Sequence, residues 1–348
     1  MFGSLHDVLT LDRLAFLKKV LAGHPLSASA VQDLLVGHRL STRRQYESGW
    51  KKFQKYVAAT GCGSVSPQVP LDFASHLFHG RAKIAAATVV NAMVAIRDPL
   101  WFGFGLAVEP RQWELMRASF FLQRPPARQV PPSWSLEKVL RLLESPRFVV
   151  EPSAEDLLLK ALFLVAMATG HRVSQLAALL RTPEFTKFGV GLSSATLVPR
   201  PGFLAKNERR GHRVLPVTFP AWVVDGAHHP LCPVAALDAY ITATSRSQVS
   251  PLWVQPGTLR PLRTADIAKK LVLLVKTADP SSRPKAHQVR KYASTLAFFR
   301  SFDVEKVRRA GQWASSRSFV SRYLLPHLRD VPCIALGVRP GASSVHLD

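Results

Sequence analysis

Apolar residues recur at helical spacing through the first third of the chain. Four leucines spaced three or four residues apart predict an amphipathic helix over residues 7–22. A second helix is expected to begin after Ser41 and Thr42, two good N-caps, and to carry an aromatic and aliphatic stripe flanked by lysines. Further helices are predicted over residues 71–79, 85–97 (ended by Asp98 and Pro99) and 111–121. This part of the chain reads as a small helical domain.

The pattern changes after residue 122. Residues 123–133 read QRPPARQVPPS, whose prolines and arginines suit an extended basic linker and mark a domain boundary. Beyond it, Ser135 can cap a helix that ends near residue 143, and two strand-like runs at 196–199 and 212–217 predict a small antiparallel sheet. Further helices are expected over residues 154–168 (buried), 173–180, 233–242, 264–276 and within 284–325. The fold class predicted is mainly α with a small antiparallel β-sheet.

The net charge of the chain limits the classes of molecule that it is expected to bind. Among 348 residues, 46 Lys and Arg stand against 23 Asp and Glu, a formal net charge of +23, which argues against an ordinary near-neutral metabolic enzyme. Such an excess favours a polyanion such as nucleic acid, with acidic membrane surfaces as the alternative. The longest apolar run, residues 161–168, is too short to span a bilayer, so a soluble protein is expected.

Cysteine and histidine usage points away from disulfides and metals. Cys62, Cys232 and Cys333 are far apart and lack CxxC spacing, and residues 1–21 carry charges throughout instead of a secretory signal. The histidines show no spacing typical of metal ligands. We therefore expect a reducing, intracellular compartment, no structural disulfide and no metal site.

One ordered set of residues in the second half contains the groups that phosphodiester chemistry needs. Guanidinium forks hold non-bridging oxygens, a proton donor serves the leaving oxygen, and a nucleophile attacks phosphorus. Each residue alone fits an ordinary surface charge or core aromatic, and only the ordered set favours catalysis. The set comprises Arg172, Lys206, His287, Arg290, Trp313 and Tyr323.

This order resembles the tyrosine recombinase (phage integrase-like) family, whose catalytic domain uses Arg, Lys, His-x-x-Arg, His or Trp, and Tyr. The sequence TGHRVSQL at 169–176 is similar to the family's first-arginine motif, and Lys206 stands where its hairpin lysine belongs. His287 and Arg290 match the second cluster, the GQW at 311–313 matches the His/Trp position, and Tyr323 matches the nucleophile. The resemblance spans essentially the whole chain.

Within the family, the chain resembles the subset carried by DIRS-like and Crypton-like elements. Three stretches carry this likeness: LCPV at 231–234, HQVRKYASTLAF at 287–298 and GQWASSRSFVSRYL at 311–324. Two features depart from the family pattern. Gln175 stands where an acidic residue is usual, and Tyr323 follows Trp313 by ten positions, one more than in typical bacterial members.

The resemblance implies a mechanism and partners. Tyr323 would attack the phosphorus to form a 3′-phosphotyrosyl link without ATP, metal or any other cofactor, Arg172 and Arg290 would hold the phosphate, and Lys206 would protonate the leaving oxygen. His287 would assist proton transfer or orient the phosphate, and Trp313 would pack under the site. The implied partners are double-stranded DNA and three further copies in a tetramer on paired sites, with no membrane and no small-molecule substrate. For a eukaryotic element, the location would be nuclear. DNA contacts are expected at Arg43, Arg44, Lys51, Lys52, Lys55, Arg209 and Arg210.

The same resemblance gives each segment a role. The expected segments are an N-terminal helical extension (1–36), a helical core DNA-binding domain (37–122), a Pro-rich linker (123–134), a catalytic domain (135–330) and a C-terminal tail (331–348). The expected function is site-specific recombination for integration or excision of a mobile element. Two alternatives stay open: a type IB topoisomerase-like enzyme, and a domesticated protein that binds DNA without cutting it. Trp313, the short tail and the compact N-terminal domain favour the recombinase, whereas Gln175 leaves the binding protein open.

Overall fold

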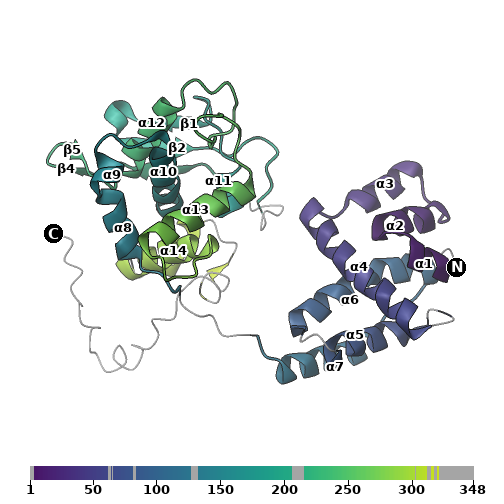
Figure 1. The fold of residues 1–348 in the computed structure, drawn as a ribbon. Coiled ribbons are helices and arrows are strands. Elements are labelled where there is room, and N and C mark those ends of the chain that lie inside the picture. The colour runs from purple at the N-terminus through teal and green to yellow at the C-terminus, as the bar shows by residue number, and fades with distance from the viewer. Residues whose placement is uncertain are drawn as a thin grey trace. The chain divides into compact units, whose positions relative to one another are not determined.

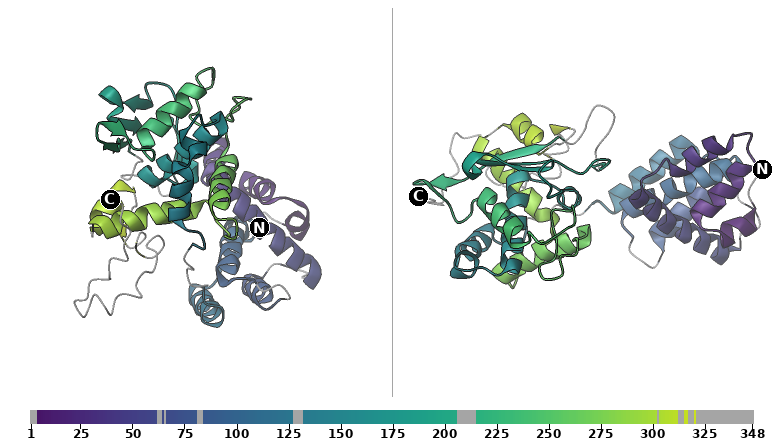
Figure 2. Two further views of the ribbon diagram at one scale, coloured as in Figure 1. Left: turned by 60° about the vertical axis from the view of Figure 1, so that its left-hand side comes forward. Right: turned by 90° about the horizontal axis from the view of Figure 1, so that it is seen from above.

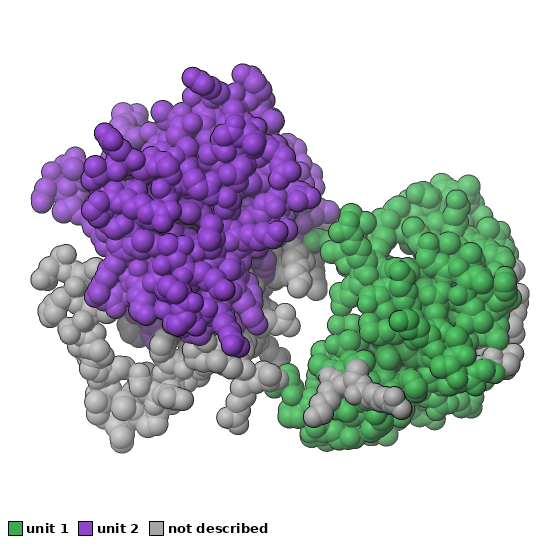
Figure 3. Space-filling model, in the orientation of Figure 1, with its two compact units in different colours: residues 1–128 green, residues 129–348 purple. Residues whose placement is uncertain are grey.

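The computed structural model describes residues 4–61, 64, 66–80, 84–126, 132–205, 215–301, 303–311, 315, 316 and 320. The chain divides into two compact units, residues 1–128 (unit 1) and residues 129–348 (unit 2), coloured separately in Figure 3. The structure is mostly helical with two small antiparallel sheets (Figure 1), which confirms the predicted fold class. No helix within the described ranges combines the length and the apolar character needed to cross a membrane.

Unit 1 is built from helices around an aromatic core. Helix α4 supplies Trp50 and Phe53, both with no exposed surface, and α5 supplies Phe73. Helices α4 and α6 cross closely at Gly49, where an added Cβ would lie 2.6 Å from the Cβ of Ala95. The elements are α1 (Leu5–Thr10), α2 (Arg13–Ala22), α3 (Ala28–Val36), α4 (Leu40–Thr60), α5 (Val69–His79), α6 (Ala86–Phe104) and α7 (Pro110–Gln123).

Two helix predictions in unit 1 are wrong: one helix is divided into two, and another begins at a different residue. The single helix expected over residues 7–22 is broken, because Asp12 takes an extended conformation and its side chain accepts a hydrogen bond from the Ala15 amide at 2.9 Å, which caps α2. Helix α4 begins at Leu40 with Arg39 as N-cap, so Ser41 and Thr42 lie inside its first turn and cap nothing there. At α4 the helix begins without any side-chain cap, so the presence of good capping residues in the sequence did not fix where the helix starts.

The predicted stop of a helix at Asp98 and Pro99 is also wrong, because α6 continues through Pro99 to Phe104. A proline inside a helix removes the donor for the carbonyl four residues earlier. That carbonyl belongs to Ala95, and the Nε of Arg13 donates to it at 2.6 Å. A buried side chain from α2 therefore repairs the bond that Pro99 removes.

Unit 2 surrounds one buried helix, α10, which packs against α12, α13 and α14 (Figures 1 and 2). Burial on all sides agrees with its apolar sequence, and its C-terminus leads directly to the candidate site. The helices are α8 (Leu136–Glu144), α9 (Pro146–Val149), α10 (Ala154–Thr169), α11 (Val173–Leu176), α12 (Pro233–Ala243), α13 (Thr264–Ala278), α14 (His287–Ser301) and α15 (Val304–Ala310), with a 3-10 turn at Val190–Leu192.

The sheets of unit 2 are short and antiparallel. In the first, the order is β1-β2-β3, and Thr196 lies opposite both Lys187 and Thr218. An antiparallel pair is found near the two predicted runs, but shifted: β2 covers 194–197 instead of 196–199, and β3 begins only at Val217, the last residue of the run predicted at 212–217. Residues 212–214 of that run lie outside the described residues. The strands are β1 (Thr186–Phe188), β2 (Ser194–Leu197), β3 (Val217–Pro220), β4 (Val223–Val224) and β5 (Ala227–His228).

The helix predicted over residues 173–180 is shorter than expected. Helix α11 ends at Leu176, and the following residues turn into bridges, Leu179 with Pro199 and Leu180 with Pro251. These bridges pair the residues after α11 with segments about 20 and 70 positions further along the chain. Helical periodicity in the sequence could not show that these residues form bridges instead of continuing the helix.

Candidate active site

The site begins at the turn between α10 and α11. Gly170 has a φ of +58°, a left-handed conformation that glycine adopts without steric cost, and its amide donates to the Ala166 carbonyl to close α10. The chain then reverses, and Arg172 becomes the N-cap of the four-residue helix α11. Its side chain is half-buried, and no acceptor within the described part of the chain bonds its guanidinium. The turn thus presents an arginine whose guanidinium can serve a ligand.

Arg290 reaches this turn from α14. Its side chain is buried, with 3% exposed, and its Nη1 donates to the Gly170 carbonyl. Its Nη2 donates to the carbonyl of Gly311, the residue after α15, at 2.9 Å. One guanidinium therefore ties together the α10–α11 turn, α14 and the end of α15.

Gln175 links the two arginines through a single atom. Its Oε1 accepts the backbone N–H of Arg172 at 2.9 Å and lies 3.4 Å from Nη1 of Arg290. The side chain is buried on α11, with 1% of the residue exposed. The backbone of Arg172 and the side chain of Arg290 thus meet at a residue that the sequence singled out only as a departure from the family pattern.

His171 directly precedes Arg172 in the sequence and lies deep in the fold. It is 4% exposed, and neither ring nitrogen has a hydrogen-bond partner within the described residues. Burial, with smaller contributions from the charges of Arg290 and Arg172, lowers the pKa of His171 to about 3. The imidazole is therefore neutral at neutral pH and adds no positive charge to those of Arg172 and Arg290.

Helix α14 is fixed in place on both sides of Arg290. The indole Nε1 of Trp134 donates to Oε1 of Gln288 at 3.1 Å, and the Tyr292 hydroxyl donates to the Trp134 carbonyl at 2.7 Å. The rings of Trp134 and Tyr292 lie 4.5 Å apart. Sequence reasoning placed Trp134 at the end of a linker and gave it no role, because its partners lie about 150 positions away.

His287 stands at the first residue of α14, one turn before Arg290, and its ring reaches the surface. Partial desolvation, followed by the charges of Lys291 and Lys285, lowers its pKa. A neutral imidazole at this position can accept or relay a proton near the arginine pair.

Several predicted site residues cannot be compared with the fold. They lie outside the described residues: Lys206, Arg209, Arg210, Trp313 and Tyr323. Their roles stay predictions.

The basic residues expected to contact DNA in unit 1 divide into two groups. Arg44, Lys51 and Lys55 are exposed and follow one face of α4, opposite the buried Trp50 and Phe53. Arg43 is half-buried, and its Nε donates to the His38 carbonyl at 2.8 Å. Nearby, Lys52 donates to Ser48. The exposed face with Arg44, Lys51 and Lys55 is better placed to contact phosphates than Arg43 and Lys52, which bond the protein itself.

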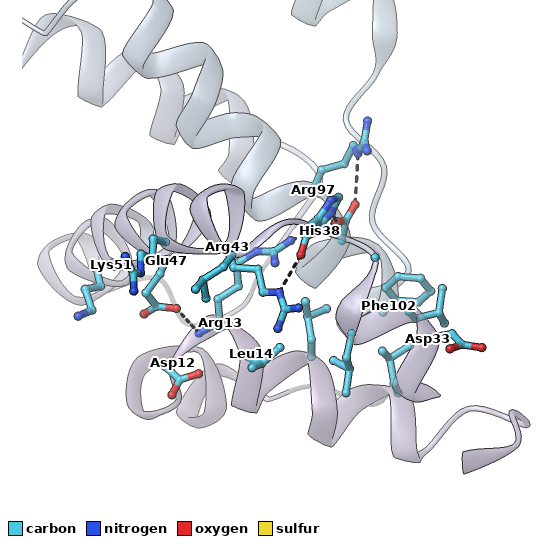
Figure 4. A pocket seen from close by; sticks show the side chains of 18 residues that line it. Asp12, Arg13, Leu14, Asp33, His38, Arg43, Glu47, Lys51, Arg97 and Phe102 are labelled. Atoms are coloured by element: carbon cyan, nitrogen blue, oxygen red, sulfur yellow. Dashed lines mark hydrogen bonds and ion pairs between the residues drawn. The ribbon is translucent and has the colours of Figure 1, made fainter. Parts of the chain in front are cut away.

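A groove of about 780 Å³ lies between α2, α3, α4 and the end of α6 (Figure 4). Its floor is apolar, whereas its rim mixes Arg44 and Lys51 with Asp12, Asp33 and Glu47. Its lining holds both signs of charge, and the carboxylates would repel a phosphate there, which makes this groove less suited to a nucleic-acid backbone than the exposed basic face of α4. Elsewhere, the described ranges contain no cluster of three His, Cys, Asp or Glu side chains placed to hold a metal ion.

Comparison with known proteins identifies the fold. No family model matches the chain, and no curated protein sequence matches it. Solved structures do match. A crystal structure of the XerH site-specific recombinase, bound to a palindromic difH substrate in a post-cleavage complex, aligns with a TM-score of 0.65 at 14% identity, covering 97% of this chain and 98% of that one.

A second neighbour is the Tn1549 transposon integrase (residues 82–397, Y379F) in complex with transposon right end DNA. It aligns with a TM-score of 0.56 at 9% identity, covering 94% of this chain and 99% of that chain. The fold of this chain is therefore the tyrosine recombinase fold. The closer likeness to DIRS-like and Crypton-like elements stays a prediction.

Proposed function

We propose that the chain is a site-specific DNA recombinase that cuts and rejoins strands through a 3′-phosphotyrosyl intermediate. The observation that carries the proposal is the arginine pair, in which Arg172 and Arg290, 118 positions apart in sequence, share the oxygen of Gln175. The backbone N–H of Arg172 and the guanidinium of Arg290 meet at this oxygen, and arginine guanidiniums are suited to the non-bridging oxygens of a phosphodiester. The fold and the net charge of +23 support the same reading.

In this mechanism the Tyr323 oxygen attacks the phosphorus, the 5′-oxygen leaves, and the new phosphotyrosyl bond conserves the energy for rejoining. Arg172 and Arg290 stabilise the charge that develops on the pentacoordinate phosphorus. Lys206 donates a proton to the leaving oxygen, and His287 assists proton transfer or orients the phosphate. Trp313 packs beneath the site and donates its single indole N–H.

The surroundings of the other tyrosines support Tyr323 as the nucleophile. The Tyr240 hydroxyl is buried and hydrogen-bonded to the backbone of Val254, and that of Tyr292 donates to Trp134. Burial raises the pKa of both phenols, which makes them poorer nucleophiles. The remaining two, Tyr46 and Tyr56, belong to unit 1, whereas the arginine pair belongs to unit 2.

A covalent selection tests the proposal without a known target. The full-length protein is incubated with nicked duplexes whose arms are randomised, and DNA that stays attached to protein in detergent is recovered and sequenced. We expect an enriched target, adducts from the wild type and from Tyr292→Phe, and none from Tyr323→Phe, whose DNA affinity stays nearly unchanged. Adducts from Tyr323→Phe would overturn the nucleophile assignment, and DNA binding without any adduct would support the binding-only alternative.

The selected duplex then tests Lys206. A 5′-bridging phosphorothiolate expels a thiolate that needs no proton, so Lys206→Ala should cleave it much better than the normal diester. Equal impairment on both substrates would assign Lys206 to phosphate binding instead.

The proposal extends to assembly and biological role. We infer that four protomers act on two sites, that the tail at 331–348 bridges neighbouring copies, and that the recombinase serves a mobile element, in the nucleus if that element is eukaryotic. Deleting residues 331–348 should spare binding to one site and reduce complexes on paired sites in native gels. If the truncated chain pairs sites as well as the full chain does, the tail has no bridging role.

A further inference from the structure

Gln175 makes two contacts that usually call for different partners. A backbone N–H is satisfied by any oxygen, whereas a buried guanidinium is most often matched with a carboxylate. Here the amide oxygen of Gln175 serves both the Arg172 N–H, at 2.9 Å, and Nη1 of Arg290, at 3.4 Å. The residue is 1% exposed, so water does not substitute for either contact.

An amide and a carboxylate differ in charge more than in shape. Glutamate at position 175 could offer an oxygen in the same place, but its negative charge would offset much of the positive charge of the adjacent arginine. The neutral amide orients Arg290 and leaves its charge in place. His171 is neutral as well, so neither of these two buried neighbours changes the charge of the arginine pair.

We propose that Gln175 is a positioning residue that holds Arg172 and Arg290 in register for a phosphate without neutralising them. The inference rests on the proposed strand-transfer function and adds a role that the sequence did not assign. Two consequences follow. Removing the amide oxygen should misplace both arginines at once, and replacing the amide by a carboxylate should keep the geometry but weaken the positive field at the phosphate and at the attacking phenol.

Three variants separate these effects. Gln175→Met keeps the length and volume of the buried side chain but cannot accept a strong hydrogen bond. Gln175→Glu keeps the acceptor and adds a charge. Ser174→Ala is the matched control, because Ser174 is the preceding residue on α11 and makes no side-chain hydrogen bond with the described residues.

The first readout is the single-turnover cleavage rate on the selected duplex at saturating protein. We expect Gln175→Met to lose roughly 100-fold in rate, comparable with the loss of one oriented donor in other active sites, while DNA affinity changes by less than about threefold. Ser174→Ala should stay within about twofold of the wild type. A folded Gln175→Met that cleaves within threefold of the wild-type rate would overturn the positioning role.

The second readout is the pH dependence of cleavage, which a packing role alone would not move. A carboxylate beside the arginines makes the attacking phenol harder to deprotonate, so the rising limb for Gln175→Glu should shift by about one pH unit to higher pH. Its plateau rate should exceed that of Gln175→Met at least tenfold. An unshifted profile would overturn the claim that the neutral amide preserves the charge, and this comparison also decides that claim if Gln175→Met fails to fold.

The third readout needs no DNA. Among the described residues, the Arg172 amide donates only to Gln175, so its hydrogen exchange in the free protein reports that bond. We expect exchange at least tenfold faster in Gln175→Met and unchanged in Ser174→Ala; equal exchange in all three proteins would overturn the positioning role. A wild-type protein that forms no adducts would contradict the proposed function alone, because amide exchange still tests the contact.

Discussion

Among the described residues, each unit of this protein buries one arginine almost completely, and the two have different partners. Arg13 in unit 1 is 5% exposed, and Arg290 in unit 2 is 3% exposed. Arg13 donates to the Ala95 carbonyl and to Oδ2 of Asp98, at 2.6 Å and 3.1 Å, and lies over the Tyr46 ring. Arg290, on α14, donates to neutral oxygens of Gly170, Gln175 and Gly311, which belong to two stretches of chain far from α14 in sequence or beyond its end.

The difference teaches how to distinguish two roles of a buried cation. Arg13 completes a local structure, since it satisfies the carbonyl that Pro99 leaves open and takes its counter-charge from the carboxylate next to that proline. Arg290 ties distant segments to the backbone of Arg172, and the charges of both arginines act on His171. The first arrangement stabilises unit 1, and the second is suited to an anion.

The largest expected effect comes from changing the fork of Arg290 while keeping its charge. Arg290→Lys should lower the cleavage rate on the selected duplex by about 1000-fold, because an ammonium cannot bond Gly170, Gly311 and a phosphate from one planar group. Single-turnover kinetics measure the loss, with DNA affinity as the control. A near-wild-type rate would contradict the proposed clamping of the phosphate by this arginine.

The matching change in unit 1 should affect stability and leave catalysis alone. Arg13→Met leaves the Ala95 carbonyl without its donor and removes the Arg13 ion pair from the partly buried Asp98, so the free energy of unfolding should fall by about 3 kcal/mol. Urea unfolding measures this. The control is Arg97→Met, because Arg97 pairs with the same carboxylate from an exposed position and should change stability by less than about 0.5 kcal/mol. Equal losses of unfolding free energy in the two variants would contradict a specific stabilising role for Arg13.

The histidines beside the two arginines sharpen the comparison through pH. His38 lies 3.5 Å from Asp98 and is partly exposed, whereas the buried His171 has its pKa lowered from 6.5 to about 3. Since the unfolded chain binds a proton that folded His171 does not, stability is retained above pH 6.5 and lost as the pH falls below it. Between pH 6.5 and 5 this loss should reach about 2 kcal/mol. Urea unfolding of His171→Leu over this range should show a flatter pH dependence, and an unchanged slope would contradict the assignment.

The smallest effect tests the repair of α6 directly. Pro99→Ala restores an N–H that can reach the Ala95 carbonyl, so it should change the stability of the wild type little. In the Arg13→Met background the same change should recover about 1 kcal/mol, the value of one hydrogen bond. A double-mutant cycle by urea unfolding measures the difference. Equal effects in the two backgrounds would show that Arg13 does not compensate for Pro99.

Much of the fold was predictable because the spacing of apolar residues along the chain indicates where helices form. The helices expected at 154–168, 233–242 and 264–276 are found as α10, α12 and α13, with ends that differ by at most two residues. Ser135 caps α8 as predicted. Errors fall where a distant residue decides the outcome, as at Pro99, whose helix continues because a side chain more than eighty positions away supplies the missing donor.

The candidate site divides in the same way. The motif around Arg172 and the spacing of His287 and Arg290 marked two arginines for phosphate chemistry, and in the structure the backbone of the first and the side chain of the second bond the same oxygen of Gln175. Gln175 was visible only as an unexpected amide, and Trp134 as part of a linker. Their contacts join residues over 100 positions apart, and such contacts leave no periodic trace in a single sequence.

The sequence by itself determined the helical architecture, the strong positive charge and the order of the residues suited to phosphodiester chemistry, because periodicity, composition and motif order are all local properties of the chain. Only the tertiary structure decided which buried arginine completes a proline-containing helix and which bonds the residues around Arg172. That distinction depends on the partners that folding brings to each guanidinium, a carboxylate beside a proline for Arg13 and an uncharged amide shared with Arg172 for Arg290. These partners are decisive because a buried charge is no longer solvated by water and is stabilised only by the groups in contact with it.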